Sequence, residues 1–179
     1  MTKNISPERY DLVAQCLHWA MAMILIYLVF SSSFEDVQDM VMEQRIQLHS
    51  GLGLTVLGLG LVRWIWRFAR PRPAPISVDA RWQKIAADII HHAFYGLFLL
   101  APLLGLILAT LVSYPVQPYG LGPLFRWPED SPMVAGFVNS LHGFAADVIL
   151  VLLVIHTAAA LYHQFVRRDA IIARMLPRI

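Results

Sequence analysis

The chain has 179 residues, of which 58% are hydrophobic and 15% are charged, whereas a soluble domain carries about 25% charged residues. Together with a mean hydropathy of +0.57, this composition excludes an ordinary soluble domain and indicates a membrane protein. The net charge of +2 gives no reason to expect a nucleic-acid partner. The single cysteine, Cys16, and the lack of a C-x-x-C-H motif exclude an internal disulfide and a covalently attached c-type haem.

Four apolar runs follow one another along the chain, in residues 12–34, 46–68, 85–113 and 134–165. Each is long enough to cross a bilayer, which takes about 20 residues in a helix. The first run is longer than the core of a signal peptide and lacks an A-x-A-type cleavage site, so we expect a retained helix. The pattern predicts an all-α fold, a four-helix transmembrane bundle that forms a single domain over residues 1–179.

The basic residues predict how the bundle is oriented. Twelve of the fourteen Lys and Arg residues lie at the N-terminus, at the end of the second run and in the segment that follows it, or at the C-terminus. The positive-inside rule puts these segments, and both termini, in the cytoplasm. The opposite side carries only Arg45 and Arg126, beside six carboxylates: Glu35, Asp36, Asp39, Glu43, Glu129 and Asp130.

Four histidines pair by their depth in the predicted membrane. His142 and His156 are fourteen residues apart, which puts them about 40° apart on one helix face and about 21 Å apart along its axis. Since the helices alternate in direction, His49 lies at the outer depth of His142, and His18 lies at the inner depth of His156. Ionisable residues inside a membrane are by default functional, so we expect two stacked bis-histidine sites.

Haem b suits these sites better than zinc. Zinc takes three or four protein ligands and is often bound by thiolates or carboxylates, whereas each depth offers two imidazoles, which suits the axial positions of haem iron. Five glycines either let a flat porphyrin approach the backbone or serve ordinary helix packing: Gly51, Gly53, Gly58, Gly60 and Gly143. His91 and His92 lie at a depth similar to that of His18 and remain alternative inner ligands.

Two further residues belong to the inner half. Arg63 follows His49 by fourteen residues, so it shares that face at the inner depth, where it pairs with a haem propionate or extends into the headgroups. His163 follows His156 by seven residues. There it is either a contact for a quinone head group, because an imidazole can donate a hydrogen bond and carry a proton, or an interfacial histidine without a role.

Several short segments together carry a resemblance to a known family. They are Leu17-His18-Trp19, His49-Ser-Gly-Leu-Gly53, Leu61-Val-Arg-Trp64, Leu141-His142-Gly143, His156, and Leu161-Tyr-His163 followed by Arg167-Arg168-Asp169. With these segments the chain resembles the bacterial cytochrome b561 family over nearly its full length. Such proteins are four-helix dihaem b-type cytochromes of the bacterial inner membrane.

The resemblance implies a set of ligands and an activity. Two haem b groups would be held by His49 with His142 and by His18 with His156, and helix three would supply no axial ligand. The activity would be electron transfer to or from the quinone pool, with ubiquinone as substrate and, in some members, superoxide as the outer donor. The outer segments depart from that last expectation, since their excess of carboxylates offers no positive funnel for an anion.

Two other functions are compatible with the same histidines. The chain could be a haem-containing membrane anchor subunit of a larger dehydrogenase or hydrogenase, although its short outer loops offer little docking surface. It could also be a metal transporter whose histidines line a path. The sequence predicts a lipid environment for the bundle and makes no prediction of its oligomeric state.

Overall fold

The computed structural model describes residues 9–31, 42–70, 73, 81–112, 116–121 and 131–177. These residues form four long helices and no strand: α1 (Leu12–Ser31), α2 (Met42–Ala69), α3 (Arg81–Leu111) and α4 (Pro132–Tyr162). Each helix is long and apolar enough to cross a membrane. The all-α, four-helix transmembrane fold is therefore confirmed, while the cytoplasmic orientation of the termini stays a prediction.

The observed helices extend beyond the apolar runs at their starts. α2 begins at residue 42 and α3 at residue 81, four residues before the predicted runs that begin at 46 and 85. Hydropathy detects only the lipid-facing length, whereas a helix continues into polar residues such as Glu43, which the helix dipole favours in a first turn. Residues 32–34 and 113, at the predicted ends of the first and third runs, lie outside the described residues.

Several residues used to predict the orientation also lie outside the described residues. They are Lys3, Glu35, Asp36, Asp39, Arg72, Arg126, Glu129, Asp130 and Arg178. Of the outer pair of arginines, Arg45 is described, and its Nη2 donates to the carbonyl of Ser31 at the end of α1 (3.3 Å).

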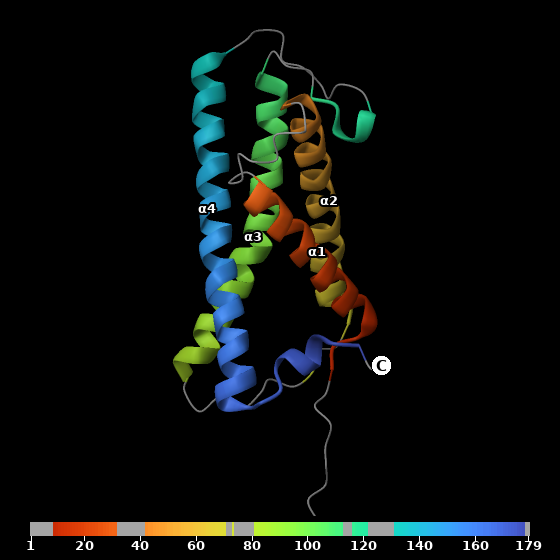
Figure 1. Cartoon of the computed structure of the whole chain (residues 1–179), viewed down its shortest axis with the longest axis vertical. Coiled ribbons are helices and arrows are strands. Elements are labelled where there is room, and N and C mark those ends of the chain that lie inside the picture. The colour runs from red at the N-terminus through yellow and green to blue at the C-terminus, as the bar shows by residue number, and fades with distance from the viewer. Residues whose placement is uncertain are drawn as a thin grey trace, which may run out of the picture.

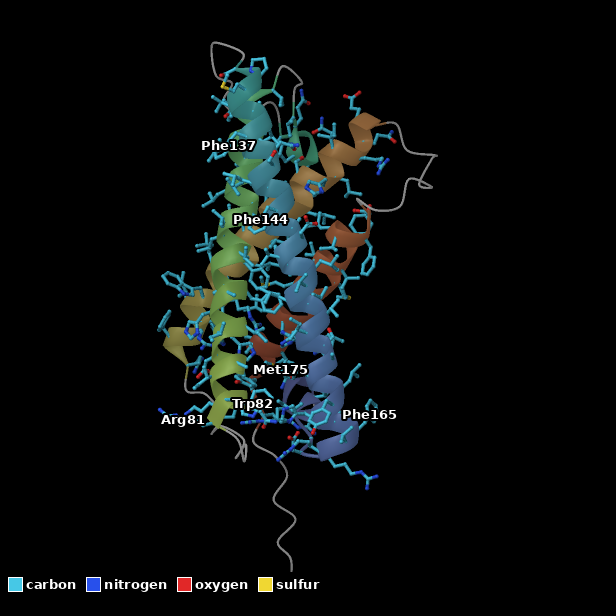
Figure 2. All side chains as sticks on the ribbon, turned by 90° about the vertical axis from the view of Figure 1, so that its left-hand side faces the viewer. Arg81, Trp82, Phe137, Phe144, Phe165 and Met175 are labelled. Atoms are coloured by element: carbon cyan, nitrogen blue, oxygen red, sulfur yellow. The ribbon has the colours of Figure 1, made fainter. Side chains whose placement is uncertain are left out.

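The bundle has a thin core and a large apolar outside. α2, α3 and α4 run along its length, and α1 crosses it obliquely (Figure 1). The core is a small cluster that includes Met21, Val56 and Phe98, one from each of α1, α2 and α3. Large side chains such as Phe137 and Phe144 remain exposed on α4 (Figure 2). This distribution suits a bundle whose outer surface contacts lipid rather than water.

The two ends of the chain close one end of the bundle together. The backbone N–H of Tyr10 donates to the carbonyl of Arg174 (3.1 Å). The indole Nε1 of Trp19 donates to the carbonyl of Met175 (2.8 Å). Met175 ends the short helix η3 (Ile172–Met175), at the end of the bundle where Trp82 also lies (Figure 2). The C-terminal segment thus packs against the start of α1.

At the opposite end, the short helix η1 (Pro118–Gly120) packs on α2. Tyr119 has a left-handed backbone (φ 53°), which costs energy for a residue other than glycine. Its hydroxyl hydrogen-bonds to Thr55 Oγ1 (2.7 Å), and its ring covers Gly51, where a Cβ would lie 2.7 Å from the ring. These contacts hold the unfavourable backbone in place.

Asp11 joins the start of α1 to α2. Its carboxylate accepts a hydrogen bond from the backbone N–H of Ala14 (3.0 Å), as an N-cap does. The same carboxylate accepts from the indole Nε1 of Trp66 on α2 (3.0 and 3.1 Å). One side chain therefore fixes both the start of α1 and its distance from α2.

We expect Asp11→Ala to lower the free energy of unfolding by about 1–2 kcal/mol, because the cap is lost and the Trp66 indole loses its partner. Unfolding of the detergent-purified protein by SDS, followed by circular dichroism, measures the change. Asp11→Asn keeps a side-chain oxygen and is the matched control, with a smaller loss. Equal losses in the two variants would contradict this account of Asp11.

Candidate functional site

His49 on α2 and His142 on α4 face each other in one half of the bundle. Their ring centroids are 5.9 Å apart, and the ring planes are inclined by 75°. His142 Nδ1 lies 2.9 Å from the carbonyl oxygen of Ala101 on α3. Because a carbonyl can only accept, Nδ1 carries the proton, and the lone pair on Nε2 is available for a metal. Metal-binding histidines are usually oriented in this way by their second nitrogen.

Gly105 on α3 makes room for the His142 ring. A Cβ at this position would lie 3.2 Å from His142 Cε1, so a larger residue would push the imidazole away from its place. Gly105 is four residues after Ala101 and therefore lies on the same face of α3. The sequence contained this signal, a pair of small residues at helical spacing, but gave no indication of which helix they faced.

In the other half, three histidines gather instead of two. His18 on α1 has its ring centroid 6.2 Å from that of His156 on α4. His91 on α3 lies 5.8 Å from His156 by the same measure. The buried ring of Phe94 packs edge-on against His156, at 5.7 Å. The structure therefore brings together the predicted pair, His18 with His156, and also one of the two alternative inner ligands.

The second alternative, His92, is directed elsewhere. Its Nδ1 lies 2.6 Å from the carbonyl oxygen of Asp88, one turn earlier on α3, so this ring bonds to its own helix. His91 and His92 are adjacent and therefore about 100° apart around the helix. Because of this rotation, His91 faces the inner cluster and His92 does not.

The spacing of both pairs fits axial ligation of haem iron. An imidazole nitrogen lies about 2 Å from a first-row metal ion and the ring centre roughly 1 Å further away, so two axial imidazoles have ring centres about 6 Å apart. The observed separations are 5.9 Å and 6.2 Å. Among the described residues, no group of three or more His, Cys, Asp or Glu side chains could hold a metal ion. A donor set of two imidazoles suits haem, whose macrocycle supplies the other ligands.

The glycines divide between the two roles expected of them. Gly51 lies against Tyr119, and a Cβ on Gly60 would lie 3.3 Å from Phe98 Cβ, so these two allow close packing. At Gly53, one turn after His49, nothing lies within 4 Å of a Cβ, and the same holds for Gly143 beside His142. The backbone next to both outer histidines is thus open to a flat cofactor. Gly58 also faces open space.

Arg63 lies beside the inner cluster. Its Nη1 donates to the carbonyl of Ala14 on α1 (3.1 Å), one turn before His18. A guanidinium has five N–H donors, so the bond to Ala14 leaves others that could bind an anion, such as a haem propionate.

His163 forms a close pair with Asp169. It begins a short π-helical turn, η2 (His163–Arg167), and its Nδ1 lies 2.5 Å from Asp169 Oδ2. Left-handed backbone at Arg168 and Ala170 (φ 56° and 57°) turns the chain back so that the carboxylate reaches the ring. Asp169 Oδ1 is buried and has no hydrogen-bond partner among the described residues. The pair is therefore a partly buried acid–base unit with one free acceptor.

The partnership of His163 with Asp169 could not be read from the sequence. Their separation of six residues is not a helical contact distance, because i, i+3 and i, i+4 are the neighbours on a helix surface. Left-handed backbone is also unusual outside glycine, and neither Arg168 nor Ala170 signals it.

Comparison with known proteins finds one family over nearly the whole chain. The family model for prokaryotic cytochrome b561 matches residues 9–178. Cytochrome b561 homolog 2 of Escherichia coli is 28% identical over 98% of this chain and 95% of its own length. Cytochrome b562 of Cereibacter sphaeroides is 30% identical over 89% and 90%. A protein of Yersinia pestis named probable superoxide oxidase CybB is 22% identical over 96% and 97%.

Gly105 offers a test of the outer histidine pair. In Gly105→Val the new side chain must displace His142, and we expect haem to bind about 10- to 100-fold more weakly at that site because the ring loses its orientation. Haem content per chain and the reduced optical spectrum measure the effect. Gly96→Val, on the same helix with nothing within 4 Å of its Cβ, is the control and should keep its full spectrum. Identical haem content in the two variants would show that Gly105 does not serve His142.

Proposed function

The chain belongs to the prokaryotic cytochrome b561 family of membrane cytochromes, and from this premise we propose that it is a dihaem cytochrome of the bacterial inner membrane. It would transfer electrons across the membrane to or from the quinone pool. The observation that carries the proposal is the presence of two imidazole pairs in separate halves of one bundle, with ring centroids 5.9 Å and 6.2 Å apart.

Four histidines would hold the two haem b groups, His49 with His142 at the outer site and His18 with His156 at the inner site. With two imidazoles to hold each iron, haem b would supply one-electron transfer, and the iron would have no position left for substrate. The hydrogen bond from His142 Nδ1 to the Ala101 carbonyl would keep Nε2 directed to the metal. A ring-nitrogen lone pair of His18, His49 and His156 would likewise bind the iron.

Arg63 would neutralise a propionate of the inner haem. Its hydrogen bond to the carbonyl of Ala14, one turn before His18, supports this role, and a pair of a guanidinium with a carboxylate is strong when partly buried. The cation would hold the cofactor in place and would also favour its reduced state, because positive charge stabilises an added electron.

His163 would bind the quinone head group, with ubiquinone as the expected substrate. Its pairing with Asp169 supports the role, because the carboxylate accepts a hydrogen bond from Nδ1 and fixes the orientation of the ring, which leaves Nε2 to face the quinone. Nε2–H can then donate to a quinone carbonyl oxygen and release its proton as the quinone takes up electrons. Asp169 would act through His163 rather than on the quinone itself.

Superoxide is the outer donor that we propose. The support is the name of the Yersinia pestis relative, probable superoxide oxidase. Superoxide is an anion and would need a local positive charge at the outer end. Among the described residues, Arg45 supplies such a charge beside the last turn of α1. If superoxide does not reduce the purified protein, the outer donor is instead a neutral molecule.

The first test is the optical spectrum of the purified protein, oxidised and reduced. We expect a low-spin b-type α band on reduction and two haems per chain, with one or fewer in His142→Ala. His92→Ala is the control and should retain both haems, since this ring bonds to its own helix. Bound zinc or copper without a haem spectrum would instead support the metal transporter, and a second polypeptide that co-purifies in fixed ratio would support the anchor subunit.

The second test concerns His163. We expect His163→Ala to slow quinone reduction on the order of 100-fold with both haem spectra unchanged, because a positioned proton donor contributes about 100- to 10,000-fold. Stopped-flow reduction of ubiquinone by the pre-reduced protein measures the rate.

A second substitution at this position separates binding from proton transfer. His163→Gln keeps a hydrogen-bond donor, so its KM should stay near the wild-type value while its kcat falls. If His163→Ala turns over at the wild-type rate, the assignment of His163 is wrong.

A further inference from the structure

His156 has two imidazole neighbours, and they come from different helices. His18 approaches from α1, at 6.2 Å between ring centroids, and His91 approaches from α3, at 5.8 Å. The two imidazole pairs that we assign to haem are separated by 5.9 Å and 6.2 Å. By spacing alone, His91 is as suitable a partner for His156 as His18 is.

Only one of the two can serve at a time. Among the described residues, no three such side chains can hold a single metal ion together, and haem iron has just two axial positions. His91 is also fixed in direction by its helix, because Phe94, on the next turn of α3, packs edge-on against His156. The face of α3 that carries His91 is therefore held against the inner site.

We propose that His91 is a reserve axial ligand of the inner haem, which takes the place of His18 opposite His156 when His18 is missing. The proposal rests on the dihaem function proposed above. It distinguishes the two sites, because His49 and His142 make a ring contact with each other and with no further histidine of the described chain. The inner haem would survive the loss of its α1 ligand, and the outer haem would not survive the loss of its α2 ligand.

The test uses the full-length holoprotein with His18→Ala. We expect it to retain two haems per chain and to keep an inner haem that is low-spin by electron paramagnetic resonance, with an altered g tensor because the ring orientation differs. His18→Ala/His91→Ala should convert the inner haem to high spin. Added imidazole should restore the low-spin state in the double variant and change nothing in the single variant.

His49→Ala is the matched control at the outer site. With no third imidazole available, it should turn its haem high-spin or lose it. In every inner-site variant the spectrum of the other haem reports whether the bundle is folded. If His18→Ala yields no haem at all, His18→Gln, which is closer in size to histidine, takes its place.

The outcomes that overturn the proposal are distinct from those that overturn the function. A high-spin inner haem in His18→Ala overturns it, as does loss of the inner haem while the outer haem remains. A double variant that stays low-spin also overturns it, since another group would then be the ligand. Failure of both His18→Ala and His18→Gln to hold a low-spin inner haem also overturns it. Wild-type protein with fewer than two haems would instead remove the dihaem function on which the proposal rests.

Discussion

The absence of water inside a bilayer is the constraint on which the interior of this protein depends. An imidazole in hydrocarbon must find its partners in the protein or in a cofactor, because an unpaired polar group there costs several kcal/mol. The chain meets this need by turning histidines of all four helices toward each other: His49 and His142 in one half, and His18, His91 and His156 in the other. The Ala101 carbonyl orients the His142 ring, and Gly105 makes room for it.

Depth and helical period were enough to predict that His49 meets His142 and that His18 meets His156. In a membrane the helices must span and must alternate in direction, so a residue's position along its run fixes its height, and His18 and His49 could be matched with His156 and His142. The rotation of each helix about its own axis was not predictable. In α3 the charged, amide and imidazole side chains all lie within residues 81–92, so the rest of the helix offers no polar face from which its rotation could be inferred, and His91 and His92 could not be told apart.

The remaining features depend on tertiary contacts that override local preference. Tyr119, Arg168 and Ala170 adopt left-handed backbone, which sequence rules assign to glycine or asparagine. At Tyr119 this backbone is stabilised by the hydrogen bond to the Thr55 hydroxyl and by packing of the ring on Gly51 of α2. At Arg168 and Ala170 the turn lets Asp169 reach His163. The partner of a functional side chain was thus hidden in a turn that no local signal marks.

The contacts between the two ends of the described chain mean that the helices reach their final surroundings in a different order from the one in which they are synthesised. α1 is translated before α2, α3 and α4, yet Arg9 and Tyr10 just before it and Trp19 within it donate hydrogen bonds to the carbonyls of Leu176, Arg174 and Met175. Those carbonyls belong to the segment that follows α4, so the surroundings of α1 stay unfinished until all four helices have been made. The helix that carries His18 therefore precedes the other three along the chain but reaches its final surroundings after them, and a chain cut near residue 170 would keep all four helices with one open end.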